Sequence, residues 1–510
     1  MNATIRQRLA RCKRRIEQRL DKRDTRGCDR PMLTASNIRY ELAERTRAIS
    51  AGGIGFIHKL VKAVGLDEAI NRRVKLLKLN MPYHESDHVL NIAYNVLAGG
   101  TCLEHLELLR TNEAFLDALG ARRIPDPTTA GDFCRRFEAW DIFLLQETIN
   151  EARLKVWGQQ PEEFFEEAVL DGDGTLVETS GECKQGMDIN YKGEWGYHPL
   201  LISLANTNEP LYLVNRSGNR PSHEGAAAYF DRAVDLCRRG GFRRITLRGD
   251  TDFTQTEHLD RWDEQGVEFV FGIDARANLY EWAENLPESA WKPLRRPQPK
   301  ARGEPREKPD NVKEQIVEER GYKNIRLKQE HVAEFAYQPT KCQKEYRVVV
   351  VWKDLEESDG QGQLFDKRCC FFYITNNWKR SAEKVVFKAN GRCNQENVIE
   401  QLKNGVRALT APVDNLLSNW AYMVIVSLAW SLKAWAALLL PERGRWARQH
   451  REEKETLLRM DFATFRNALI QIPVQILRTS RRIVYRLLSW NRWQPAFFRL
   501  LDQLALPLRC

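Results

Sequence analysis

The order of apolar segments between residues 165 and 274 constrains the fold of this chain more than any other feature. Three strand-like segments come first, and then helix-like and strand-like segments alternate. The strands are expected at 166–175, 197–206, 210–219, 243–250 and 267–274, and the helices at 224–241 and 254–266. A helix between two strands predicts a crossover connection, which makes the strands parallel neighbours in one sheet. The sequence therefore predicts an α/β fold with a three-stranded meander followed by two crossover strands.

The flanking regions have different patterns. Residues 36–160 read as helices; the segment "HVLNIAYNVLAGG" has helical apolar spacing and stops at Gly99-Gly100, and Thr128 or Thr129 is expected to cap a later helix. Strand-like runs after residue 275 predict a β-rich insertion, whose segment 291–311 is charged and Pro-rich and should be an exposed loop. The expected divisions are a basic arm (1–35), a helical DNA-binding domain (36–160), the first part of the core (161–274), the insertion (275–375), the second part of the core (376–440) and a basic helical C-terminal region (441–510).

The charge of the chain is concentrated at its two ends. There are 79 Lys and Arg against 69 Asp and Glu, and the first 30 residues alone hold eleven basic and four acidic side chains. Basic ends favour a polyanion partner, although a solvated charged face gives the same pattern. The 11 Cys form no C-x-x-C pair and the N-terminus has no apolar signal segment, which indicates a cytoplasmic protein. The apolar run in 419–440 is too short for a span, so we expect a buried helix and no membrane.

The stretch "AVLDGDGTLVETSG" holds two aspartates, Asp171 and Asp173, that fit more than one chemistry. A calcium loop would need Gly at the position of Leu176 and helical flanks, and has neither. A haloacid dehalogenase-like phosphatase would use Asp171 as nucleophile and Asp173 as general acid/base. However, only 76 residues separate Asp173 from Asp250, which leaves little room for the other groups that such a site needs.

The third interpretation is two-metal phosphodiester chemistry, in which carboxylates from separate elements hold two Mg²⁺ ions. Asp173 and Asp250 end two strands that are expected to be neighbours. The segment "NGRCNQENVIEQLKNGV" predicts a helix on which Arg392, Glu396 and Lys403 fall within about 40° of one another. An exposed Arg-Glu pair with a solvated Lys would look the same, and Glu400 is a rival acid.

In this order the motifs resemble those of the DDE transposases of bacterial insertion sequences, in particular the group 1 DDE transposase domain. Arg392, Glu396 and Lys403 fit the last three positions of the Tyr-x₂-Arg-x₃-Glu-x₆-Lys signature, while its Tyr position holds Ala389. The segments "DGT" at 173–175 and "RGDTDF" fit the two Asp motifs, and the likeness runs from about residue 40 to 490. It implies a ribonuclease H-like mixed sheet with a β-rich insertion, an all-α domain before it and a basic helical region after it.

The resemblance also implies a function. Asp173, Asp250 and Glu396 would bind Mg²⁺, with Mn²⁺ as a substitute, and Arg392 and Lys403 would bind DNA phosphates. Asp171 and Asp252 are expected to support the metal ligands from behind. The partners would be double-stranded DNA at the element ends and target, and a second copy of the chain in a synaptic complex, on the nucleoid of a bacterial cell. A DNA-binding protein without activity is the remaining alternative. Trp291 and Trp352 are candidates for stacking on an unpaired base.

Overall fold

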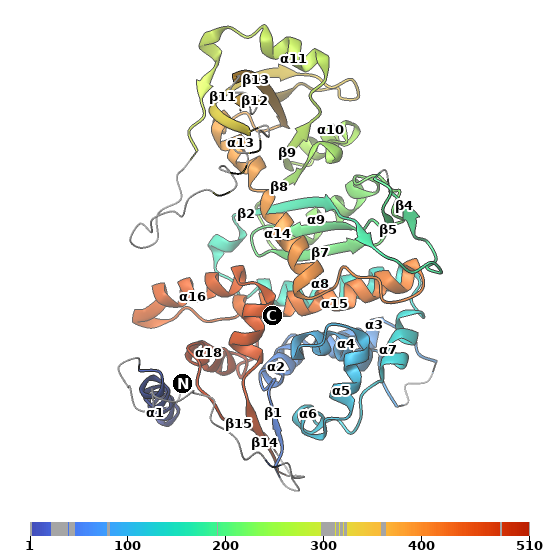
Figure 1. The fold of residues 1–510 in the computed structure, drawn as a ribbon, viewed down its shortest axis with the longest axis vertical. Helices are drawn as coiled ribbons and strands as arrows, with labels where there is room; N and C mark the ends of the chain where they lie inside the picture. The colour runs from blue at the N-terminus through green and yellow to red at the C-terminus, as the bar shows by residue number, and fades with distance from the viewer. Residues whose placement is uncertain are drawn as a thin grey trace.

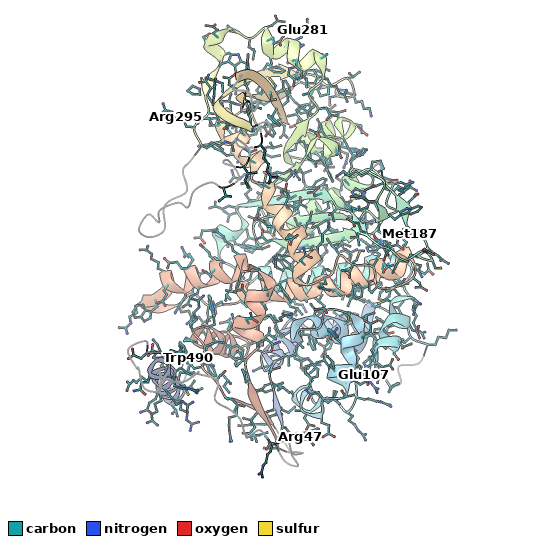
Figure 2. All side chains as sticks on the ribbon, viewed as in Figure 1. Arg47, Glu107, Met187, Glu281, Arg295 and Trp490 are labelled. Atoms are coloured by element: carbon teal, nitrogen blue, oxygen red, sulfur yellow. The ribbon has the colours of Figure 1, made fainter. Side chains whose placement is uncertain are left out.

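A computed structural model describes residues 3–21, 39, 46–78, 82–190, 192–296, 312, 316, 320, 324–358, 364–479 and 482–508. The fold is mixed α/β and is built around one large mixed sheet (Figure 1). Figure 2 shows the side chains in the same view, with Arg47 and Glu281 near opposite ends of the long axis. Residues 22–35 of the expected arm, and residues 297–311 of the expected loop, lie outside the described residues.

The N-terminal part is helical, apart from one short strand. Its elements are α1 (Ala3–Arg19), β1 (Ala48–Ile49), α2 (Ile54–Val64), α3 (Leu66–Arg73), α4 (Glu85–Ala98), η1 (Leu103–His105), α5 (Leu106–Arg110), α6 (Glu113–Leu119), α7 (Pro127–Cys134) and α8 (Ala139–Trp157). Helix α4 ends at Ala98 and is followed by Gly99, whose φ of 118° is accessible to glycine and costly for other residues. The predicted cap of α7 was wrong: Asp126 accepts a hydrogen bond from the Thr129 amide (2.9 Å), because Pro127 fits the first helical position.

The large sheet has nine strands in the order β10-β11-β12-β13-β9-β8-β2-β6-β7. Its central part comprises β2 (Glu167–Gly174), β6 (Leu200–Leu204), β7 (Glu209–Val214), β8 (Arg244–Gly249) and β9 (Glu268–Ile273). Strand β2 pairs antiparallel with β6 and parallel with β8, and β8 pairs parallel with β9. Helix α9 (Ala226–Arg239) packs on β2, β6, β7 and β8. The meander and the two crossovers expected from the sequence are present in this order.

The strands beyond residue 275 continue the same sheet. They are β10 (Lys292–Pro293), β11 (Asn324–Tyr337), β12 (Tyr346–Ser358) and β13 (Leu364–Thr375), and β13 pairs antiparallel with β9. Helix α13 (Ala382–Asn390) closes a small apolar cluster over these strands, which includes Val349, Val351 and Val385. The rings of Trp291 and Trp352 pack edge to face with centroids 5.0 Å apart, so each is already engaged with the other.

The smaller elements connect these layers. They are η2 (Glu162–Phe165), β3 (Val177–Glu178), β4 (Asp188–Ile189), β5 (Trp195–Tyr197), η3 (Thr251–Phe253), η4 (Thr256–His258), α10 (Leu259–Glu264), α11 (Ala277–Glu284) and η5 (Glu288–Ala290). Strands β3, β5 and β4 form a separate small sheet directly after β2. Figure 1 shows α13 and α14 (Cys393–Glu400) running one after the other past the central strands.

The C-terminal part returns to the N-terminal helices. It contains α15 (Leu416–Leu438), η7 (Gly444–Trp446), α16 (Ala447–Arg459), α17 (Phe462–Phe465), a π-helical turn η8 (Arg466–Ile470), β14 (Val474–Arg478), β15 (Ile483–Leu487) and α18 (Gln494–Gln503). The helical prediction was wrong at 474–487, where β14 and β15 form a hairpin that pairs with β1. Alternating β-branched and aromatic residues in this segment favour a strand once an edge partner is available.

Helix α15 is the central apolar helix of the molecule. It is long and apolar enough to cross a membrane, but its apolar window is entirely buried within the protein. It packs on α2, α4, α7 and α8 of the N-terminal part and on β7 of the sheet. The buried-helix prediction for this segment is therefore confirmed.

Candidate functional site

Asp173 and Asp250 lie side by side at the carboxyl ends of adjacent parallel strands. In the β2–β8 register, Asp171 is opposite Arg248, so the positions two residues further along are Asp173 and Asp250. Asp250 directly follows β8, and its Oδ1 accepts a hydrogen bond from the Asp252 amide (3.1 Å). The sequence prediction that these two acids meet at one edge of the sheet is thus supported by the pairing of the strands.

Arg392 connects the two aspartates. Its Nη1 atom lies 3.1 Å from Asp173 Oδ2 and 4.0 Å from Asp250 Oδ2. Arg392 is the residue that precedes α14, where the chain passes from α13 into the next helix. One guanidinium therefore lies between two carboxylates of the sheet and compensates part of their charge.

Glu396 is one helical turn beyond Arg392 and adds a third negative charge. Burial raises the pKa of Asp173 to about 6; Arg392 opposes this shift, whereas Asp250 and Glu396 add to it. Burial likewise raises the pKa of Asp250, with Arg392 opposing and Asp252 contributing in the same direction. A carboxyl group such as that of Asp173, whose pKa is raised by burial and by neighbouring carboxylates, is poised to take up a cation.

Lys403 also lies within electrostatic reach of Asp173. Burial lowers the pKa of Lys403, and the charges of Glu178, Glu400 and Asp173 oppose that shift. The expected single helix over 390–406 was wrong in detail: α13 ends at Asn390, α14 begins at Cys393, and Gln401–Gly405 form a π-helical turn. The 100° rotation per residue therefore does not hold as far as Lys403, although the charge of Asp173 still acts on its ammonium group.

Asp171 and Asp252 differ from each other in their surroundings. Asp171 is 1% exposed, and both of its carboxylate oxygens accept hydrogen bonds from Arg248, at 2.6 and 2.7 Å. A nucleophile must be reachable, so this pairing argues against the phosphatase interpretation. Asp252 is exposed at the start of η3, next to Asp250, and its charge acts on Asp250 through space.

The donor set at this edge fits a hard divalent cation in type. Carboxylate oxygens are the ligands that Mg²⁺ prefers, and Asp173 and Asp250 already face one shared positive group. Among the described residues, no three His, Cys, Asp or Glu side chains are gathered closely enough to form a metal-binding group. The observed arrangement thus places the carboxylates of Asp173 and Asp250 around Arg392, with Glu396 close enough to raise the pKa of Asp173.

Three residues that the sequence analysis missed surround the acids. The ring of His198 lies against Gly174, where an added Cβ would meet Cε1 at 3.0 Å and Nε2 at 3.2 Å. Its Nδ1 is 2.9 Å from the Arg220 carbonyl oxygen. Gln395 and Arg248 are buried behind the acids. A lone His after a strand and a buried Gln in a helix carry no sequence signal, because only the fold brings them here.

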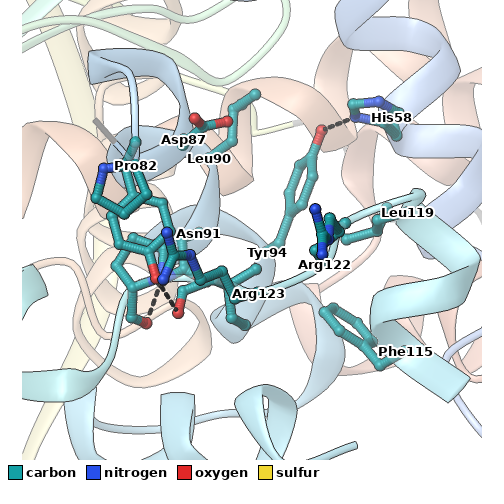
Figure 3. A pocket seen from close by; sticks show the side chains of 14 residues that line it. His58, Pro82, Asp87, Leu90, Asn91, Tyr94, Phe115, Leu119, Arg122 and Arg123 are labelled. Carbon is teal, nitrogen blue, oxygen red and sulfur yellow. Dashed lines mark hydrogen bonds between the residues drawn. The ribbon is translucent and has the colours of Figure 1, made fainter. Parts of the chain in front are cut away.

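A large hollow lies elsewhere, in the N-terminal helical part. It encloses about 710 Å³ between α4, α6 and the segment before α7, and Figure 3 shows Tyr94 meeting His58 within it while Arg122 and Arg123 lie beside it. A smaller cavity of about 390 Å³ borders the acidic edge, and its lining includes Thr251, Asp252 and Lys341. None of the three candidate acids lines the larger hollow.

Replacing Asp173 by Asn should stabilise the metal-free protein at high pH. The folded protein holds the Asp173 proton more tightly than the unfolded chain does, because the pKa is raised to about 6. The ionised carboxylate therefore costs stability fully above that pH and not at all below about pH 4. We expect Asp173→Asn to raise the free energy of unfolding by up to roughly 3 kcal/mol at pH 8. Denaturant titrations in EDTA at pH 8 and pH 4 measure this; an equal effect at both values would contradict it.

A family model described as Transposase DDE domain group 1 matches residues 34–507. No curated protein matches the chain. One similar solved structure is the cryo-EM structure of the piggyBac transposase synaptic complex with hairpin DNA, at 12% identity and a TM-score of 0.35. It covers 83% of this chain and 84% of its own, and nothing further follows from a likeness of that size.

Proposed function

Because this chain belongs to the group 1 DDE transposase family and is a DNA transposase, we propose that Asp173, Asp250 and Glu396 form its catalytic triad. The observation that carries this proposal is the position of Arg392 between the carboxylates of Asp173 and Asp250, with Glu396 one turn away. The three acids come from two adjacent strand ends and one helix. Their reaction would be hydrolysis of a strand at the element boundary, followed by attack of the freed 3′-hydroxyl on target DNA.

Two Mg²⁺ ions held by these acids, or Mn²⁺ in their place, would activate the attacking oxygen and stabilise the leaving oxygen. The protein itself would supply the binding of DNA phosphates. Arg392 presents a planar guanidinium suited to phosphate oxygens, and Lys403 presents a half-buried ammonium near Asp173. Arg392, which lies between the two carboxylates, would be placed to contact a phosphate oxygen of the DNA.

The core is proposed to be ribonuclease H-like. Support comes from the strand order β7-β6-β2-β8-β9, in which an antiparallel meander of three strands is followed by two parallel crossover strands. In such a sheet the ends of the first and fourth strands are adjacent, which suits acids at positions 173 and 250. The strands after residue 275 would be an insertion between the second Asp and the Glu.

The partners would be double-stranded DNA at the inverted-repeat ends of the element and at the target, in a bacterial cytoplasm. Joining two ends in one complex calls for two active sites, so a homodimer is proposed for the synaptic state. The test is Mg²⁺-dependent nicking of a labelled duplex that carries the DNA flanking the gene, beside a phosphate monoester as control substrate. Nicking at the repeat end supports the proposal, whereas hydrolysis of the monoester alone would overturn it.

Binding to DNA should weaken steeply with salt, and α1 should contribute to that dependence. This helix carries seven Lys or Arg and one acid and has no buried residue. Each phosphate that it neutralises adds about −0.9 to the slope of log K against log salt. Removal of residues 1–21 should therefore flatten the slope. Fluorescence anisotropy of labelled DNA measures it between roughly 50 and 300 mM salt, where the affinity of such contacts falls steeply.

The matched control for this experiment is Glu17→Gln, which removes the acid that pairs with Lys13 at 3.5 Å. Its effect should have the opposite sign, because it raises the net positive charge of the same helix. The basic segment 443–486 is a second candidate surface, although its Arg481 lies outside the described residues. An unchanged slope after truncation would assign the phosphate contacts to other parts of the chain.

A further inference from the structure

A buried ion pair lies directly behind the candidate acids. Asp171 on β2 and Arg248 on β8 are 1% and 6% exposed and form a two-pronged contact, with Nε–Oδ1 at 2.6 Å and Nη2–Oδ2 at 2.7 Å. Asp171 is two residues before Asp173 on β2, and Arg248 is two residues before Asp250, which directly follows β8. The pair therefore holds β2 and β8 in register at the positions just before Asp173 and Asp250.

Arg248 has a third contact, which reaches the helices. Its Nη1 donates to the carbonyl oxygen of Lys388 in α13 at 2.7 Å. Gly391 leaves the room for this: a Cβ there would lie 2.4 Å from the same Nη1 atom. The absence of a side chain at 391 is thus needed for the guanidinium to reach from the strand into the α13–α14 joint.

Gln395 ties the following helix to the same place. It is 1% exposed, and its Nε2 donates to the Asp171 carbonyl oxygen (3.0 Å) and to the Leu201 carbonyl oxygen (3.2 Å). It precedes Glu396 in the chain. The backbone of β2 is therefore attached to α14 one residue before the third candidate acid.

We propose that Arg248 and Gln395, with Gly391 as the residue that makes room, are positioning residues for the divalent-metal site. They join β2, which carries Asp173, to β8, which Asp250 follows, and to the α13–α14 segment, in which Glu396 lies. The inference rests on the proposed triad. Acids from three separate elements can share a metal ion only when those elements are held in register, and groups that orient the ligands of a metal set its affinity.

A second buried pair provides a matched control. Arg153 on α8 and Glu209 on β7 are 1% and 0% exposed, with Nε–Oε1 at 2.9 Å, and Arg153 Nη2 also donates to a backbone carbonyl, that of Pro210, at 2.7 Å. This pair resembles Asp171–Arg248 in burial and in chemistry but connects elements other than those that carry the candidate acids. If Arg248 had a purely structural role, substitutions in the two pairs would change metal affinity to the same extent.

The experiment measures Mn²⁺ binding to the full-length protein without DNA, by electron paramagnetic resonance of free Mn²⁺. Arg248→Lys should weaken binding roughly 10–100-fold, because Lys cannot hold both carboxylate oxygens and the Lys388 carbonyl together. Gly391→Ala and Gln395→Leu should also weaken Mn²⁺ binding, and either variant can test the proposal if Arg248→Lys does not fold. Arg153→Lys should leave Mn²⁺ affinity within about twofold of the parent.

The outcomes distinguish a failure of the positioning role from a failure of the proposed triad. Unchanged affinity in the Arg248, Gly391 and Gln395 variants, or an equal loss in Arg153→Lys, would overturn the positioning role. If the Asp173→Asn and Glu396→Gln variants bound Mn²⁺ as tightly as the parent protein, the proposed triad itself would be contradicted. Selective weakening in the three variants, with the triad variants abolishing binding, is the expected result.

Discussion

Replacing Glu396 by Gln is expected to reduce Mg²⁺-dependent nicking of an element-end duplex by roughly a thousandfold or more. The change keeps the size of the side chain and removes one negative charge from the set around Asp173. Metal-assisted charge stabilisation is worth several kcal/mol in the transition state, and each 1.36 kcal/mol is a factor of ten in rate. Asp173→Asn should cause a comparable loss, while DNA binding by both variants stays close to that of the parent.

Glu400→Gln is the matched control for this substitution. Glu400 lies one turn beyond Glu396, is exposed, and accepts a hydrogen bond from Asn404 at 2.7 Å. The same chemical change there should leave nicking within a few-fold of the parent, since the charge of Glu400 acts on Lys403, whereas that of Glu396 acts on Asp173. If Glu400→Gln abolished nicking and Glu396→Gln did not, the third acid would be Glu400.

Asp171→Asn distinguishes the proposed reaction from phosphatase chemistry. If Asp171 were a nucleophile, this substitution would abolish hydrolysis of a phosphate monoester. In the proposed transposase it acts only through Arg248, so a loss of about 10–100-fold in nicking is expected, less than for Asp173→Asn. Loss of monoester hydrolysis in Asp171→Asn, with Glu396→Gln unaffected, would reverse the assignment.

The central sheet and the two aspartates could be predicted because both depend on local sequence. Apolar runs of strand length, separated by helices, determine which strands are parallel, and Asp173 and Asp250 end two of these runs. The position of Glu396 could be proposed from its spacing to Arg392. That spacing alone does not give the bend between α13 and α14 or the π-helical turn at Gln401–Gly405, because both depend on packing against the sheet.

The remaining features depend on contacts between distant segments. Arg248 and Asp171 are 77 positions apart and meet only because β2 and β8 are neighbours. Strand β14 pairs with β1, which lies more than 400 residues earlier in the chain. Neither partner is visible in the local periodicity, so the sequence predicts a helix in the C-terminal segment and a supporting role for Asp171 without a counter-ion.

Replacing Glu209 by Ala should cause the largest loss of stability of the changes considered. Glu209 is fully buried on β7 and accepts four hydrogen bonds, two on each oxygen. The donors are Arg153 Nε (2.9 Å), Trp435 Nε1 (2.8 Å), Trp157 Nε1 (3.1 Å) and Thr207 Oγ1 (2.6 Å). These side chains come from α8, α15 and the β6–β7 turn, so one carboxylate holds the N-terminal helices, the central apolar helix and the edge of the sheet together.

Removing this carboxylate leaves the Arg153 guanidinium buried without its counter-ion and both indole N–H groups without an acceptor. Breaking a buried pair by removing one partner costs about 3–5 kcal/mol, because the remaining charge stays desolvated. Urea denaturation followed by Trp fluorescence should show a fall of that size for Glu209→Ala and a smaller one for Glu209→Gln, which retains two acceptor lone pairs. Glu452→Ala removes a carboxylate of the exposed Arg448–Glu452 pair, whose side chains are 94% and 65% exposed, and should change little. A Glu209→Ala protein as stable as Glu452→Ala would show that water reaches Arg153, and that the helices and the sheet are joined by apolar packing alone.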